Sequence, residues 1–396
     1  MTGRTVLITG VTRVLGSSLA GRLAAHPAID RVIGVDAALP EPAARARMGA
    51  AEFARADIRS PLIGRVLDAA GVDTVVHASA SSTPAGSAAR SMAKEMNVLG
   101  TMQLLAACQR SNSVRHLVVR STDAVYGRSP RDPAVATEGM QPHSLAVTGR
   151  ERDAIDIEGY VRGFGRRRPD VRVVVPRLAA IIGPTVRTPL TRYFSLTPFV
   201  PVVGGHDARM QLLHEDDAIA LMEHLVLGNF AGIVNVAGDG AMSVAQAIHR
   251  AGRLPLPIPA AAVGGVGRAL ALFGVSGFSA SQVRDLAVGR VLDTTRLAAE
   301  VGFRPRYSTV AAFDDFVTTL SPALSERAVR AAEERVASAV GATARPLTPV
   351  PPPDEPADPA PPDVRPVGPP PRPRLVSVPG VGAPRRTAPR RGSRTR

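Results

Sequence analysis

The segment Thr9-Gly10-Val11-Thr12-Arg13-Val14-Leu15-Gly16 decides the fold of this 396-residue chain. It follows a strand-like run at Thr5–Thr9 and leads into a helix-like stretch at Leu15–Ala25. A strand, a glycine-rich turn and a helix in this order point backbone N–H groups and the positive end of the helix at a pyrophosphate. Asp36 ends the next strand-like run, 20 residues after Gly16. At that spacing a carboxylate reaches the ribose hydroxyls of an adenine dinucleotide.

The surrounding sequence alternates between short β-branched runs and longer amphipathic stretches. This alternation predicts an α/β fold, a Rossmann-type doubly wound parallel sheet with helices on both faces. The expected strands are Thr5–Thr9, Arg31–Asp36, Glu52–Asp57, Thr74–His77, His116–Arg120 and Val171–Val175. The expected helices are Leu15–Ala25, Pro61–Ala70, Ala88–Gln109 and Asp153–Arg167.

The pattern loosens after Pro184 and predicts four parts in the chain. Residues 1–184 form the dinucleotide-binding domain, to whose sheet some later segments return, and residues 185–320 form a small α/β substrate lobe. Within this lobe, Leu254–Ala280 is apolar but rich in proline and glycine, so we expect a covering helix rather than a membrane span. Residues 321–344 are expected to form a helix. Residues 345–396 are a basic, proline-rich tail that we expect to be disordered, with no identified partner.

Composition excludes several classes of protein. Cys108 is the single cysteine, which rules out a disulfide scaffold and a cysteine-based zinc site. The formal net charge is +14, but the tail contributes ten arginines against four acidic residues, so the charge does not indicate a nucleic-acid-binding domain. We expect no membrane partner, no secretion signal and a cytoplasmic location.

The cofactor expected from these residues is NAD. The carboxylate of Asp36 would repel the 2′-phosphate of NADP. Arg13 stands where the turn usually has glycine, and its guanidinium can pair with a phosphate, so NADP stays open as an alternative.

Eight motifs in order resemble those of extended short-chain dehydrogenases/reductases, in the NAD-dependent epimerase/dehydratase group known for nucleotide-sugar enzymes. The resemblance spans roughly Thr5 to Thr319. Its motifs are Thr9–Gly16, Asp57-Ile58, Val75–Ala80, Asn97–Thr101, Ser121–Gly127, Arg177–Pro184, His214–Asp217 and Asp293–Pro305. The resemblance and the spacing together imply cofactor contacts from Thr9, Gly10, Thr12, Arg13, Val14, Leu15, Gly16, Asp36, Asp57, Ile58, Ala78, Ser79, Ala80, Asn97 and Ser121.

The family's catalytic tetrad is matched only in part. Thr122 matches the Ser/Thr that holds the substrate oxygen, and Asn97 matches the supporting asparagine. The sequence contains no YxxxK motif, and Lys94 is the only lysine. Our alignment places Thr148 and Arg152 at the tyrosine and lysine positions, to within two residues. Arginine cannot relay a proton as lysine can, so another group must serve as acid/base if catalysis occurs. The candidates are Tyr126, Glu138, His143 and Glu151.

The resemblance implies a small-molecule substrate of the nucleotide-sugar kind. Ala180 stands where the family has a substrate-side asparagine, and Arg187, Arg192 and Arg209 could hold a diphosphate. We expect substrate contacts from Thr122, Asp123, Tyr126, Arg177 and Arg209. For His214–Asp217 we expect helix capping, not a metal site. Family analogy implies a homodimer. The two hypotheses are an epimerase, dehydratase or reductase with a non-standard acid/base, and a dinucleotide-binding sensor or scaffold without redox turnover.

Overall fold

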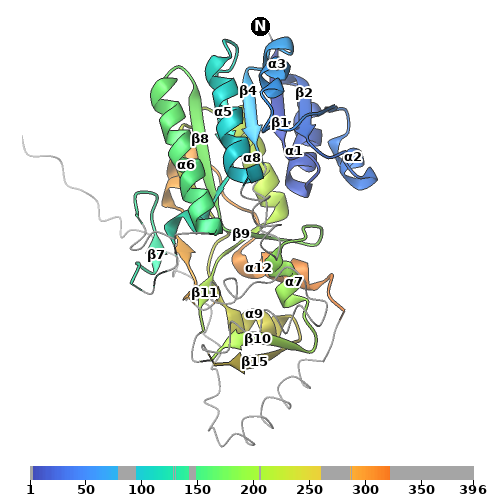
Figure 1. Ribbon diagram of the computed structural model, residues 1–396. Helices are drawn as coiled ribbons and strands as arrows, with labels where there is room; N and C mark the ends of the chain where they lie inside the picture. The colour runs from blue at the N-terminus through green and yellow to red at the C-terminus, as the bar shows by residue number, and fades with distance from the viewer. Residues whose placement is uncertain are drawn as a thin grey trace, which may run out of the picture. The chain divides into compact units, whose positions relative to one another are not determined.

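The strands at the centre of the molecule form one parallel sheet. The computed structural model describes residues 3–78, 95–127, 129, 131–141, 149–204, 207–259, 286 and 288–321. The sheet order is β13-β8-β5-β4-β1-β2-β3, with the short β6 also pairing with β8 (Figure 1). The bounds are β1 Arg4–Thr9, β2 Ile29–Asp36, β3 Glu52–Arg55, β4 Thr74–His77, β5 His116–Val119, β6 Ser121–Thr122, β8 Arg172–Leu178 and β13 Gly232–Val236.

Helices cover both faces of this sheet because its strands are apolar on both sides. Val6 and Ile8 of β1 pack with α1 (Val14–Ala24) and α8 (Glu215–Leu227). Leu7, between them, faces the opposite core. There it packs with α3 (Leu62–Ala69), α5 (Gly100–Arg110) and α6 (Arg150–Arg167). A short helix α2 (Pro42–Met48) packs beside α1. The predicted doubly wound α/β sheet is therefore confirmed, and β13 is a late segment that returns to it.

A smaller lobe follows β8 and has its own core around Phe194, Phe313 and Phe316. β9 pairs with β12, and β10 with β15, both in parallel, while β11 pairs with β14 in antiparallel. The lobe's elements are β9 Ala180–Ile182, α7 Pro189–Phe194, β10 Phe199–Val203, β11 Arg209–Met210, β12 Leu212–His214, β14 Met242–Ser243, α9 Val244–Arg250, β15 Leu254–Ile258 and α12 Thr309–Val317. Three further short elements pack against the main sheet or the lobe: β7 Val135–Ala136, β16 Val291–Leu292 and η4 Leu297–Val301.

The expected helix from Leu254 is wrong over its first residues, because Leu254–Ile258 is a strand. Pro255 and Pro257 lack the N–H groups that a helix interior needs. A strand paired on one side only needs N–H groups at alternate residues, so alternating prolines fit there. The rest of that prediction, residues 260–280, lies outside the described residues.

The chain divides into Met1–Thr343 and Ala344–Arg396. The second part and the expected helix at 321–344 lie almost wholly outside the described residues, so the predicted domain boundaries stay predictions. Within the described residues, no helix is long and apolar enough to cross a bilayer.

Candidate functional site

The glycine-rich loop is built so that its backbone can approach a ligand closely. Gly10 has φ +80°, a left-handed conformation that favours glycine. A Cβ on Gly16 would lie 2.3 Å from the carbonyl oxygen of Gly10, so α1 packs this tightly against the end of β1 only with glycine there. Arg13 is the N-cap of α1. Among the described residues no side chain caps this helix, and no acidic residue lies in its first turn, so its N–H groups fit an anion.

Asp36 holds the loop at the end of β2. Its Oδ2 accepts hydrogen bonds from the Oγ1 of Thr12 at 2.7 Å and from the backbone N–H of Thr12 at 3.2 Å. The glycine loop and the predicted ribose carboxylate are therefore adjacent in space. A carboxylate oxygen accepts more than one hydrogen bond, so these contacts leave capacity for a ribose hydroxyl.

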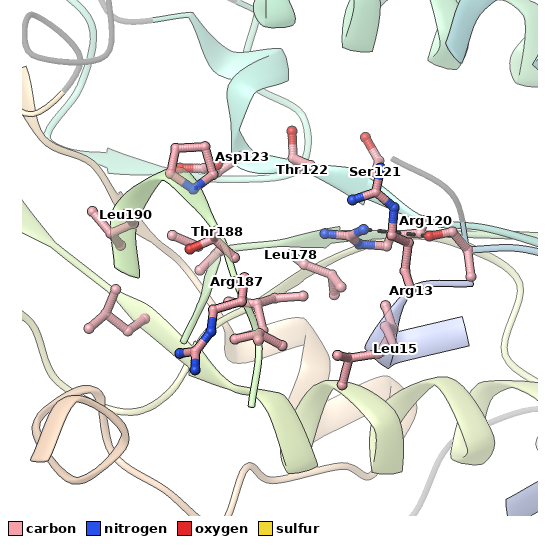
Figure 2. Close-up of a pocket in the computed structure, with 18 of the residues that line it drawn as sticks. Arg13, Leu15, Arg120, Ser121, Thr122, Asp123, Leu178, Arg187, Thr188 and Leu190 are labelled. Atoms are coloured by element: carbon pink, nitrogen blue, oxygen red, sulfur yellow. Dashed lines mark hydrogen bonds between the residues drawn. The ribbon is translucent and has the colours of Figure 1, made fainter. Parts of the chain in front are cut away.

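A cavity of about 580 Å³ opens at the carboxyl ends of the strands, between the sheet and the lobe. This volume suits a small-molecule or cofactor site. Figure 2 shows side chains from the glycine loop, from β6 and from the segment before α7 around the same space. The lining includes Thr12, Arg13, Val14, Leu15, Ala78, Asn97, Arg120, Ser121, Thr122, Asp123, Ala180, Arg187 and Arg290.

Thr122 and Asn97 both line this cavity, as the resemblance implies. Thr122 is the N-cap of the short helix η2 (Asp123–Tyr126), and its Oγ1 accepts a bond from the N–H of Ala124 at 3.3 Å. Its hydroxyl proton is therefore available to a substrate oxygen. Asn97 lies in a π-helical turn, η1 (Glu95–Leu99), where the sequence pattern predicts a regular helix. Such turns occur often at functional sites.

Arg152, which our alignment places at the family's lysine position, is not on the cavity wall. Its Nε lies 3.0 Å from a carboxylate oxygen of Asp156, one turn along α6. The α6 residues on the cavity wall are Asp153, Ala154 and Ile157. Asp153, the residue after Arg152, therefore brings an acidic group to the cavity wall. Our alignment is accurate only to within two residues, and the charge pattern alone does not fix which side of a helix faces the cavity. The sequence therefore left the orientation of Arg152 open.

Neither tyrosine nor lysine lines the cavity within the described residues. All four tyrosines are described: Tyr126 and Tyr193 are buried, Tyr307 stacks on His214, and Tyr160 is exposed. Of the other proposed bases, Glu138 accepts a bond from the N–H of Asn235 at 2.9 Å, and Glu151 is not on the wall. The predicted site residues Ser79, Ala80, His143 and Thr148 lie outside the described residues.

A cluster of buried polar side chains contacts the cavity wall through Ser121. Glu158 accepts bonds from Ser121 Oγ at 2.6 Å and from Arg177 Nε and NH2 at 2.9 and 2.6 Å. Arg177 also donates to Tyr126 Oη at 2.8 Å, and Tyr126 donates to Asn235 Oδ1 at 2.5 Å. Burial raises the pKa of Tyr126, against the effect of Arg177. Tyr126 and Arg177 do not line the cavity, so the substrate contacts predicted for them have no counterpart in its wall.

Seven other predicted residues are also not on the cavity wall: Thr9, Gly10, Gly16, Asp36, Asp57, Ile58 and Arg209. Arg59 donates to both carboxylate oxygens of Asp57 and lowers the pKa of that carboxyl. Ile58 is buried against Gly100. Arg209 is exposed, and its neighbour Met210 lines the cavity instead. Sequence reasoning missed Arg120, Arg290 and Asp153, for which no local motif provides a signal.

His214 caps α8, as predicted: its ring accepts a bond from the N–H of Asp216 at 3.2 Å. Asp217 accepts from the N–H groups of Arg306 and Tyr307, each at 2.9 Å. The acidic residues of this segment therefore anchor backbone segments. No group of three or more metal-ligand side chains occurs among the described residues.

Comparisons with known proteins agree with this arrangement. An uncharacterized protein of Mycobacterium tuberculosis is 46% identical over 334 residues, which is 84% of this chain and 89% of that protein. A trifunctional UDP-glucose 4,6-dehydratase, epimerase and reductase of Arabidopsis thaliana is 29% identical over 199 residues, 47% of this chain and 29% of that protein.

Solved structures show the same fold. The UDP-glucose 4-epimerase of Thermotoga maritima, solved with UDP-glucose, has a TM-score of 0.63 at 17% identity, over 80% of this chain and 98% of that one. The UDP-glucuronic acid 4-epimerase of Bacillus cereus, solved with NAD, has a TM-score of 0.60 at 17% identity and the same coverages. The family model for the NAD dependent epimerase/dehydratase family matches residues 6–237. The chain therefore belongs to the NAD-dependent epimerase/dehydratase family.

Proposed function

We propose that this protein is an NAD-dependent enzyme of the epimerase/dehydratase type that acts on a nucleotide-sugar-like substrate. We further propose that Asp123 replaces the missing tyrosine as the acid/base. The observation that carries the proposal is one continuous cavity, lined by the glycine loop, by Thr122 and Asp123, and by Arg187 and Arg290.

The residues of the loop fit a dinucleotide. Gly16 lets α1 pack closely against the end of β1, the N-terminus of α1 offers N–H groups, and Asp36 lies beside Thr12, where a ribose carboxylate is expected. NAD, when bound, accepts and returns a hydride. The substrates named for the relatives and solved structures, such as UDP-glucose, support a sugar nucleotide, whose diphosphate Arg187 and Arg290 would bind.

The chain's own residues then have separate roles in the proposal. Thr122 donates a hydrogen bond from its hydroxyl to the reacting substrate oxygen and holds that oxygen in place. Asp123, the next residue, takes the proton from the hydroxyl group that is oxidised and returns it on reduction. A positioned acid/base contributes about 10²- to 10⁴-fold to such a rate.

A second function, dinucleotide binding without turnover, is favoured by a different observation. Among the described residues no tyrosine or lysine lines the cavity, and Arg152 is paired with Asp156. A protein of this kind would bind NAD as a sensor or scaffold.

One experiment separates the two functions. The purified chain is mixed with NAD and a panel of UDP- and dTDP-sugars, NADH absorbance is followed, and the products are resolved by chromatography, because epimerisation yields no net NADH. We expect turnover that falls at least about 100-fold in Asp123→Asn. Asp153→Asn, which changes another carboxylate of the cavity wall, is the matched control and should keep most activity.

The remaining outcomes are distinct. Full activity in Asp123→Asn refutes the role of Asp123. Calorimetric NAD binding without any product supports the non-redox function. The absence of binding by NAD and NADP, oxidised or reduced, refutes both functions.

A further inference from the structure

A second cavity, of about 400 Å³, lies where the parallel strands begin, opposite the carboxyl ends that hold the first cavity. Arg4, Thr74, His116 and Arg172 line it, and each is the first residue of its strand, β1, β4, β5 and β8. These strands are neighbours in the sheet. Thr74 pairs with His116, and His116 pairs with Arg172, in register. The sheet therefore brings together basic residues that are far apart in the sequence.

This cavity carries an excess of positive charge. Its lining has three arginines, Arg4, Arg115 and Arg172, against one carboxylate, Asp73. Both oxygens of Asp73 are already engaged, by the N–H of Thr5 at 2.6 Å and by the hydroxyl of Thr74 at 2.5 Å.

The arginines of the cavity bind neutral groups or a shared carboxylate. Arg4 donates to the carbonyl of Val226 at 3.1 Å, and Arg172 donates to Asn229 Oδ1 at 3.0 Å. Arg115 lies 3.8 Å from Asp170, which is bound more closely by Arg168 at 2.7 Å. The charges of Arg4 and Arg172 are thus without a carboxylate partner in the part of the chain that the structure describes.

Two buried donors from the same wall also lack an acceptor. The NH2 group of Arg172 lies 3.0 Å from Nδ1 of His116. A guanidinium only donates, so Nδ1 accepts, and the neutral ring carries its proton on Nε2. Neither Nε2 of His116 nor Nε of Arg172 has a hydrogen-bond partner among the described residues. Buried donors are normally satisfied, so these two indicate a missing acceptor.

The electrostatics of the cavity agree with its geometry. Burial, Arg172 and Arg4 lower the pKa of His116 to about 3, so this ring stays neutral. Burial and Arg4 also lower the pKa of Arg172, because the two arginines repel each other across the cavity. An anion bound in the cavity would reduce this repulsion.

We propose that this cavity is a second anion site, which binds a phosphate-sized oxyanion at the edge of the sheet opposite to the dinucleotide loop. The guanidinium groups of Arg4, Arg115 and Arg172 supply the positive charge. The ligand class is a free phosphate or the phosphate group of a larger metabolite. This site is independent of the proposed enzymatic function.

The test is titration calorimetry with inorganic phosphate, at an ionic strength held constant with chloride. In the first titration, saturating NAD occupies the glycine loop so that phosphate cannot bind there. If NAD does not bind, the titration is repeated without NAD on Arg13→Gln, which lacks the main arginine that would compete for phosphate. We expect one phosphate per chain. Arg172→Gln and Arg115→Gln should each weaken binding about tenfold or more. Arg115 is exposed, so its variant should fold even if Arg172→Gln does not.

Arg65→Gln is the matched control, because it removes the same charge from an exposed position on α3. It should bind phosphate like the original chain. The absence of phosphate binding, an equal loss in Arg65→Gln, or a loss in Arg13→Gln alone would overturn the proposal. A parallel titration with glucose 1-phosphate distinguishes the sources: equal affinity indicates that phosphate alone is recognised, and tighter binding indicates a phosphorylated metabolite.

Discussion

The two ends of the parallel strands each bury a histidine, in different surroundings. We call the side where the strands end the first edge, and the side where they begin the second edge. His77 ends β4 beside the glycine loop, and its ring nitrogens contact the hydroxyls of Thr9 at 2.7 Å and Thr101 at 2.9 Å. His116 begins β5, and its ring contacts Arg172 through one nitrogen only. At the first edge, neutral hydroxyls therefore contact both ring nitrogens. The second edge collects positive charge that the described residues do not neutralise.

The largest expected effect concerns the ion pair behind the first edge. Arg177 and Glu158 are both almost fully buried, with side chains 6% and 3% exposed. Glu158→Ala would leave the guanidinium of Arg177 buried without its carboxylate, and Ser121 without its acceptor. We expect the free energy of unfolding, measured in urea, to fall by about 3–5 kcal/mol.

Asp156→Ala is the control for that experiment. It breaks the pair with Arg152, whose side chain is 41% exposed, and should cost less than about 1 kcal/mol. Equal losses in the two variants would contradict the contrast between the buried cluster and the helix surface.

The sequence predicted the sheet well because its signals are local. The apolar runs of β1, β4 and β5 and the turn at Gly10–Gly16 act within a few residues, and the structure reproduces them nearly residue by residue. The strand at Leu254–Ile258 was missed although its two prolines argue against a helix, because an apolar run does not by itself distinguish helix from strand and the pairing with β10 is a distant contact.

The candidate site was predicted only where a motif is contiguous. Thr122 and Asn97 lie on the cavity wall as expected, because each sits in a short segment of fixed conformation. Arg152 does not, because a shift of one residue along α6 turns a side chain by about 100° around the helix. The cluster of Arg4, His116 and Arg172 was not foreseen, since strand order brings together residues that no local pattern connects.

Acid should lower the stability of the folded chain through both buried histidines. Burial lowers the pKa of His77 to about 4, and burial with Arg172 and Arg4 lowers that of His116 to about 3. The unfolded chain protonates each ring near pH 6.5, while the folded chain does not. Stability is therefore fully present above pH 6.5 and is lost as the pH falls toward 4, by up to about 3 kcal/mol for each ring.

Unfolding free energies between pH 3 and 7 would measure this effect. His77→Gln should flatten the profile from pH 6.5 to 4, and His116→Gln should flatten it to about pH 3. An unchanged profile in either variant would show that the ring in question titrates normally.

The smallest expected effect tests cofactor choice at the first edge. Asp36→Ala removes the carboxylate expected at the ribose, and we expect NAD to bind about tenfold more weakly, with a smaller loss for NADP because the repulsion of its 2′-phosphate disappears. Asp36 also holds Thr12, so a loosened loop would weaken both cofactors. Thr12→Val separates the two causes, because it removes the hydroxyl bond and keeps the charge. It should weaken both cofactors equally in calorimetry, whereas an unchanged preference in Asp36→Ala would mean that Asp36 serves only to hold the loop.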